Sequence, residues 1–101
     1  MKHKFNVEAN DHVYGDIQEA VNFYNQKKDS LGTRFYNSAK REMNSLKNDA
    51  LLYQIRYENV RCVRVKNFPY LIHYIVNQKT KTVRIYSIVS MHKDPNANWV
   101  R

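Results

Sequence analysis

The chain has 101 residues, 43% of them hydrophobic and 26% charged, which suffices for one modest hydrophobic core and is unlike the composition of a disordered chain. Its single cysteine, Cys62, excludes a disulfide framework and a cysteine-rich zinc site. Because no apolar run could span a membrane and residues 1–11 lack the apolar stretch of a signal peptide, we expect a cytoplasmic protein.

The formal net charge of +8 at pH 7 is concentrated in the second half of the chain. Residues 1–50 contain eight Lys and Arg against seven Asp and Glu, whereas residues 51–101 contain nine against two. This imbalance favours an anionic partner, either nucleic acid or an acidic protein, over a membrane surface. The alternative is a basic surface that is merely solvated.

The first half of the chain predicts a strand followed by a hairpin of two helices. Residues 3–8 alternate between apolar and polar side chains, as in a short edge strand. The period becomes helical at Asp16, which with Glu19 resembles a capping box, so we expect the first helix to begin there. Residues 29–32 indicate a tight turn in which Gly32 is available for a positive φ. The apolar stripe of the second helix follows at Phe35, Ala39, Met43 and Leu46.

The second half predicts a meander of three strands. Residues 61–66 alternate, with Val63 and Val65 on one face, whereas residues 70–76 are apolar on both faces, as in a central strand. Residues 77–81 are the polar connection of a hairpin, and residues 82–91 are the last strand. One face of that strand should carry Val83, Ile85, Val89 and Met91, and the other face Arg84, Tyr86, Ile88, Ser90 and His92.

The order β-α-α-β-β-β predicts a single α+β domain over residues 1–101, in which the helix hairpin packs on one face of a small antiparallel sheet. The other face of the sheet is then partly open. That face should present Arg64, Lys66, Arg84, Tyr86 and His92. These residue types hold phosphates and stack on bases, although ordinary strand packing and a solvated basic face account for the same pattern.

Two residues are candidates for proton transfer. His92, beside Lys93, could act as general acid or base when a 2′-hydroxyl attacks the adjacent phosphate of RNA. Glu58, the only Glu after residue 50, could act as a base or as an ion-pair partner. His73 is better explained by core packing, and Cys62 as a half-buried strand cysteine. The four histidines lack metal-ligand spacing, so we expect no metal and no other cofactor.

The most distinctive segment is residues 61–74, Arg-Cys-Val-Arg-Val-Lys-Asn-Phe-Pro-Tyr-Leu-Ile-His-Tyr. Together with the expected helix starts at Asp16 and Leu31 and the closing Lys93-Asp-Pro with Trp99, it resembles the RelE/ParE superfamily of bacterial toxins. These are the toxin halves of type II toxin–antitoxin pairs. The resemblance spans nearly the whole chain and implies a helix hairpin on an antiparallel sheet. It also implies a cognate antitoxin, a small protein with a largely unstructured segment that folds on binding.

Two activities occur in this superfamily. RelE-like members are ribosome-dependent mRNA endonucleases, whereas ParE-like members block DNA gyrase without cleaving RNA. The nucleases usually carry an Arg at the start of the third strand, where this chain has Leu71. Many members with Phe-Pro-Tyr have a His and an Arg at the positions of Ser90 and Lys93, so the chain departs there as well. The Phe-Pro-Tyr pattern of residues 68–70 resembles the ParE side.

The resemblance therefore favours a gyrase inhibitor that arrests growth without catalysis. The alternatives are a ribosome-dependent endoribonuclease, with His92 and Glu58 as catalytic residues, and an inactive relative that only binds its antitoxin. The residues expected to contact the target or RNA are Arg61, Arg64, Lys66, Arg84, Tyr86 and Lys93. The sequence does not identify the residues that contact the antitoxin. An edge strand over residues 3–8 would allow a homodimer, and the antitoxin would allow a hetero-oligomer.

Overall fold

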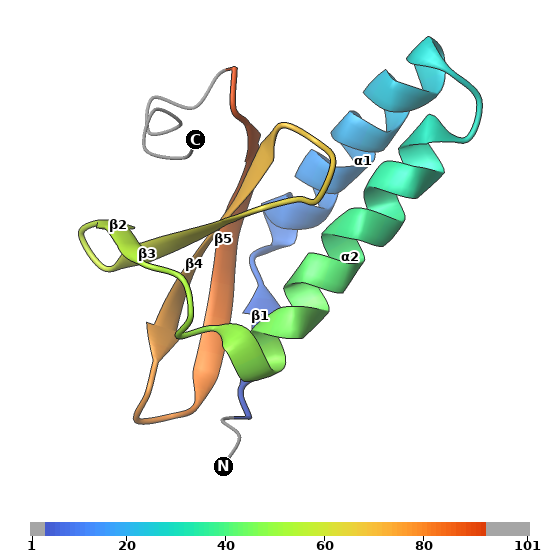
Figure 1. Ribbon diagram of the computed structural model, residues 1–101. Coiled ribbons are helices and arrows are strands. Elements are labelled where there is room, and N and C mark those ends of the chain that lie inside the picture. Colours follow the sequence, from blue (N-terminus) through green and yellow to red (C-terminus); the bar gives the residue numbers. More distant parts are fainter. Residues whose placement is uncertain (1–3, 93–101) are drawn as a thin grey trace.

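Two helices form a hairpin that covers one face of a five-stranded sheet in the computed structural model, which describes residues 4–92 (Figure 1). The helices are α1 (Asp11–Lys27) and α2 (Leu31–Asp49). The predicted α+β class and the packing of both helices on one side of the sheet are confirmed. In the described part of the chain, no helix is both long and apolar enough to cross a bilayer.

The first helix begins at Asp11, so the prediction of a start at Asp16 is wrong. Asn10 is the N-cap in extended backbone, and its carbonyl accepts a hydrogen bond from the N–H of Val13 at 2.9 Å. Val13 is fully buried and extends the apolar stripe by one turn, across Gly15, which hid the pattern in the sequence. Asp16 instead links the helix to the sheet, because its Oδ2 accepts a hydrogen bond from the N–H of Ile88 at 3.4 Å.

The turn between the helices also differs from the prediction. Ser30, with φ 69°, takes the left-handed conformation that was expected of Gly32. Gly32 lies in the first turn of α2, where a Cβ would clash with the backbone oxygen of Val21 and lie 2.6 Å from Oδ1 of Asn25. The glycine is therefore required for the close approach of the two helices rather than for a positive φ.

The strands are β1 (Asn6–Ala9), β2 (Ile55–Tyr57), β3 (Val60–Arg64), β4 (Tyr70–Asn77) and β5 (Thr82–Ser90), arranged in the order β1-β5-β4-β3-β2. The predicted meander is present, and β4 is its central strand. The sheet is mixed rather than antiparallel, because β1 pairs with β5 in parallel. A parallel pair needs a long connection, which the intervening helices and strands supply. β2 was not predicted, because three residues are too few to show alternation.

A β-bulge in β5 reverses the expected faces at its end. Tyr74 of β4 pairs with Ile85, and the preceding His73 pairs with Ser87, so Tyr86 is the extra residue. Beyond the bulge, Ile88 joins the core that faces the helices, and Val89 lies opposite Leu71 on the other face. The sequence predicted the reverse for these two residues, because strict alternation has no place for an extra residue.

An aromatic cluster joins both helices to the start of β4. The ring of Phe35 lies 5.2 Å from Phe68 and 5.0 Å from Tyr70, and Tyr24 lies 5.0 Å from Phe68. Edge-to-face pairs at such distances add about 0.5–1.5 kcal/mol each to the stabilisation from burial. The Phe-Pro-Tyr segment therefore packs on the helix hairpin, and Phe68 is buried.

Candidate functional site

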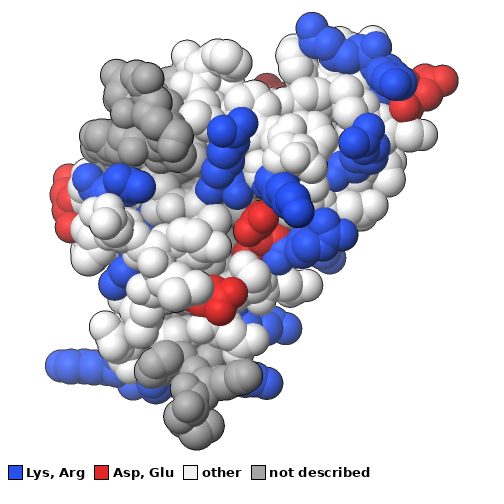
Figure 2. All heavy atoms as spheres, viewed as in Figure 1, with Lys and Arg blue, Asp and Glu red and all other residues white. Residues whose placement is uncertain are grey.

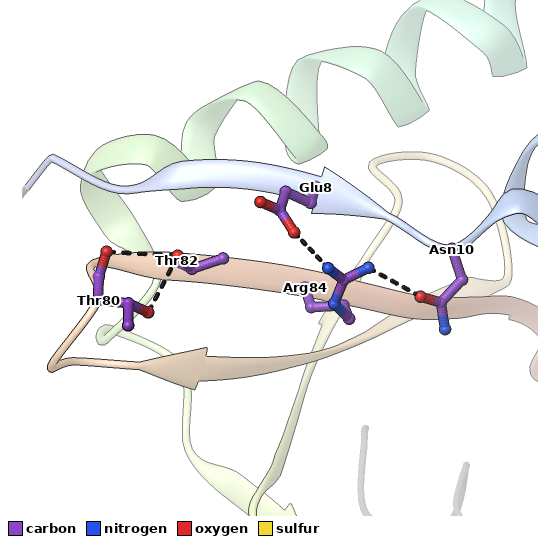
Figure 3. Close-up of polar contacts among 5 residues, drawn as sticks. All are labelled: Glu8, Asn10, Thr80, Thr82 and Arg84. Atoms are coloured by element: carbon purple, nitrogen blue, oxygen red, sulfur yellow. Dashed lines mark hydrogen bonds and ion pairs between the residues drawn. The ribbon is translucent and has the colours of Figure 1, made fainter.

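Arg84, on β5, is held by two side chains, one from β1 and one that follows β1. Its guanidinium forms an ion pair with Glu8 and donates a hydrogen bond to Oδ1 of Asn10 at 3.0 Å (Figure 3). The parallel register places Glu8 beside Arg84, so the topology itself positions the pair. Both side chains are about half exposed, and an anionic ligand approaching Arg84 must compete with this carboxylate.

Two further arginines also donate hydrogen bonds to backbone carbonyls. Nε of Arg64 donates to the carbonyl of Phe68 at 3.1 Å, and Nη1 of Arg61 donates to the carbonyl of Tyr53 at 2.6 Å. Arg61 pairs with Tyr74, a core residue, so its side chain starts from the helix side of the sheet. Arg64 and Lys66 are exposed at the end of β3.

The predicted cationic residues are not brought into one group. Arg64 pairs with Leu71 and Arg84 is opposite Ile75, so both lie on the face away from the helices but four positions apart along β4. Strand rise and spacing then place their Cα atoms about 16 Å apart, too far to hold one phosphate together. Figure 2 shows Lys and Arg spread over the visible face, with Asp and Glu among them. The sheet face that was expected to be continuously basic therefore carries cations that lie apart from one another.

The two candidates for proton transfer lie at different places in the sheet. His92 is exposed just after β5, and its N–H donates to Oγ of Ser90 at 3.2 Å. Glu58, with φ 48°, is exposed in the turn between β2 and β3. Strand rise and the sheet order separate them by more than about 20 Å. Tyr86 is the residue of the β5 bulge and is 39% exposed, and Lys93 lies outside the described residues.

A buried polar cluster lies on the sheet face away from the helices. Nδ1 of His73 is 2.9 Å from the hydroxyl of Tyr57 and 3.5 Å from Sγ of Cys62. His73 and Cys62 are both buried, which confirms that His73 packs in the interior and makes Cys62 more buried than expected. The sequence could not place this thiol beside an imidazole, because the two residues meet only through the β3–β4 register. Their burial favours a structural role.

A groove of about 490 Å³ runs between α1, α2 and β1, and we call it the hairpin groove. Among residues 4–92 its lining has five apolar or aromatic side chains, two amides and two lysines, and no carboxylate: Val7, Tyr14, Ile17, Gln18, Tyr36, Lys40, Met43, Asn44 and Lys47. Tyr14 is 60% exposed and Tyr36 42%, and the ammonium of Lys40 lies 5.6 Å from the centre of the Tyr36 ring. Exposed rings flanked by cations suit an apolar segment that also carries acidic residues.

A second hollow, of about 600 Å³, lies between α1 and the ends of β4 and β5, and we call it the α1–β5 pocket. It is lined by Asp16, Glu19, Ala20, Phe23, Tyr24, Pro69, Tyr70, Ile88, Val89, Ser90 and His92. Burial and the nearby carboxylate of Glu19 raise the pKa of Tyr70, and burial and the neighbouring Tyr70 raise the pKa of Tyr24. The sequence does not predict this pocket, because Asp16 has the pattern of a helix cap.

Residues 4–92 contain no group of three or more His, Cys, Asp and Glu that could hold a metal ion.

Comparison with known proteins finds similarity to solved structures. No protein-family model matches the chain, and no curated protein sequence matches it significantly. The structure is similar to a chain in the solved structure of the chromosomal ParDE TA system from P. aeruginosa, with a TM-score of 0.74 and 14% sequence identity. The match covers 87% of this chain and 97% of that one. The two chains therefore share one fold.

Proposed function

We propose that the chain is the cytoplasmic toxin of a type II toxin–antitoxin pair and that it arrests bacterial growth by binding DNA gyrase without cleaving RNA. The fold shared with a chain of a ParDE TA system supports this proposal, as does the resemblance of residues 61–74 to the RelE/ParE superfamily. A fold alone hosts several functions, so the choice between them rests on the site residues.

The separation of His92 from Glu58 is the observation that carries the non-catalytic proposal. Cleavage of RNA needs an acid and a base that both reach one phosphodiester within about 3 Å. Within residues 4–92 these two candidates are more than about 20 Å apart. The candidate arginines hold carbonyls or a carboxylate of their own chain. This arrangement favours recognition of a large protein surface over proton transfer.

The proposed target contacts are five cations and one tyrosine of the second half of the chain. Arg64 and Lys66 project at the end of β3, and Arg84 lies on β5, held by Glu8 of the edge strand β1. Arg61, Tyr86 and Lys93 complete the proposed set. Cations spread over a surface suit a broad anionic partner, whose charges are themselves distributed.

The antitoxin is proposed to bind in the hairpin groove. The groove offers Tyr14 and Tyr36 as exposed aromatic anchors and Lys40 and Lys47 as cations. An amphipathic segment that folds on binding would bury its apolar side chains there and set acidic residues against the lysines. We expect the neighbouring gene to encode this small partner.

A pair of assays tests the activity. Purified toxin should inhibit supercoiling by gyrase and should leave mRNA intact in cell-free translation followed by primer extension. Cleavage within codons on the ribosome would replace the proposal by the endonuclease alternative. Absence of growth arrest on induction in a sensitive host would leave only an antitoxin-binding relative.

A further inference from the structure

The α1–β5 pocket stands out by charge on a chain with a net charge of +8. Two carboxylates, Asp16 and Glu19, line it from α1, and among residues 4–92 no Lys or Arg lines it. One cation contacts a lining residue through its ring: the ammonium of Lys27 lies 4.9 Å from the centre of the Phe23 ring. The pocket is thus an acidic and aromatic hollow on a chain whose net charge is positive.

The carboxylate of Asp16 is held in place but retains acceptor capacity. Its Oδ2 accepts the N–H of Ile88, which ties the side chain to β5. Within residues 4–92 neither Oδ1 of Asp16 nor the carboxylate of Glu19 accepts a hydrogen bond from a side chain or forms an ion pair. A carboxylate can accept about four hydrogen bonds, so several acceptor positions face the hollow.

The aromatic walls complete a site for a planar cation. Tyr24 and Tyr70 lie 6.0 Å apart between ring centres, and Phe23 packs edge-on to Tyr24 at 5.2 Å. A guanidinium group stacks on such rings and pairs with carboxylates through two parallel hydrogen bonds, which an ammonium cannot do. We infer that the α1–β5 pocket binds an arginine side chain of a partner polypeptide, with Asp16 and Glu19 as its anionic ligands.

The partner is assigned as the antitoxin, and this assignment rests on the proposed function. Cations spread over a surface do little to fix the register of a mostly acidic segment, whereas one acidic pocket admits a cation at one position only. The two sites lie on nearly opposite sides of α1. The α1–β5 pocket uses Asp16 and Glu19, whereas the hairpin groove uses Tyr14, Ile17 and Gln18. Since a helix is about 10–12 Å wide, the arginine must be at least about three or four residues from the side chains in the hairpin groove.

The test uses two peptides, acetyl-Gly-Arg-Gly-amide and the same peptide with citrulline, which keeps the shape of arginine without its charge. The arginine peptide should shift the backbone amide resonances of Ile88 and Ser90, with a Kd on the order of 1 mM. The citrulline peptide should bind at least ~10-fold more weakly. In the double variant Asp16→Asn, Glu19→Gln the preference for arginine should disappear. Asparagine can still accept the Ile88 N–H, so this variant keeps the link between helix and sheet.

Glu42→Gln is the matched control, because it removes one carboxylate from α2 outside the pocket and should leave the preference intact. Equal shifts from both peptides, shifts away from the pocket, or a preference that survives the double variant would overturn the inference. With the antitoxin in hand, the double variant should weaken the complex at least ~10-fold, and an unchanged affinity would overturn the assignment of the partner. If the arginine peptide binds but supercoiling by gyrase is unaffected, the proposal of gyrase as the target is refuted, whereas the proposal of an arginine site is retained.

Discussion

Asn25 of α1 accepts a hydrogen bond from the backbone N–H of Gly32 in the first turn of α2, at 2.8 Å. The N–H groups of a first helical turn have no partner within their own helix, and Ser30 at the N-cap makes no side-chain hydrogen bond. A side chain of one helix therefore caps the other. This contact needs a residue without a Cβ at position 32.

Gly32→Ala should destabilise the protein by about 1–3 kcal/mol, because the added methyl group meets the backbone oxygen of Val21 and Oδ1 of Asn25. Gly15→Ala is the matched control, since nothing lies within 4 Å of its added Cβ. That substitution should stabilise α1 by up to about 1 kcal/mol. Urea unfolding measures both, and equal effects of the two substitutions would contradict the assigned role of Gly32.

Stability should fall above about pH 10, because four tyrosines hold their protons more tightly when folded. Burial raises the pKa values of Tyr24, Tyr53, Tyr70 and Tyr74, most strongly for Tyr74. The unfolded chain then loses protons first as pH rises, so unfolding becomes favoured. Urea midpoints measured between pH 8 and 11 should decrease, and midpoints that stay constant would refute this.

Tyr74→Phe should separate the contribution of the Tyr74 hydrogen bond to stability from the contribution of its ionisation at alkaline pH. The Tyr74 hydroxyl donates to the carbonyl of Ala50 at 2.7 Å, so its removal should cost about 1–3 kcal/mol at neutral pH. The same variant should show a shallower loss of stability at alkaline pH. The exposed Tyr14→Phe is the control, and a profile equally shallow in both variants would speak against a special role of Tyr74.

Reversal of Arg64 to Glu should relieve growth arrest while the protein stays folded, since Arg64 is exposed and loses one hydrogen bond worth about 0.5–1.5 kcal/mol. Arg84→Glu should also relieve it, but it places two carboxylates side by side at Glu8. The charge swap Glu8→Arg with Arg84→Glu keeps an ion pair and controls for that repulsion. Full toxicity of the combined Arg64→Glu, Arg84→Glu variant, measured by growth after induction, would exclude this face as the effector surface.

Lys40→Glu with Lys47→Glu should weaken antitoxin binding at least ~10-fold, because both lysines flank the hairpin groove. Lys66→Glu changes one charge on the sheet, outside the groove, and should leave the affinity within a few-fold. Isothermal titration calorimetry of the toxin with its antitoxin gives these values. A larger effect of Lys66→Glu would move the antitoxin contact to the sheet.

The sequence predicted the elements whose periodicity is long. The stripe at Phe35, Ala39 and Leu46 and the apolar run of β4 are where they were expected. It failed where local rules compete with tertiary contacts. Asp16 has the sequence pattern of a cap, yet its carboxylate accepts a hydrogen bond from the N–H of Ile88. The β5 bulge at Tyr86 reverses the alternation of side chains that the sequence predicts for this strand.

The candidate site was harder to predict than the fold, for a physical reason. Residue type and alternation assign Arg64 and Arg84 to one face, but distance along that face depends on the β3–β4–β5 register. The ion pair of Arg84 depends on a parallel partner strand, and nothing in the local pattern around Glu8 indicates that pairing. Both pockets are formed by segments distant in sequence, so they became visible only with the folded chain.

The pairing of β1 with β5 has a consequence for synthesis in the cell. Asn6 pairs in register with Thr82, so β1 cannot take its place in the sheet until β5 has also been synthesised. The helix hairpin, whose contacts are local, can assemble long before. The hairpin groove and the α1–β5 pocket are lined by residues of β1 and β5, respectively, so a nascent chain has neither in final form before β5 has been synthesised, and a partner that needs them can bind only after that.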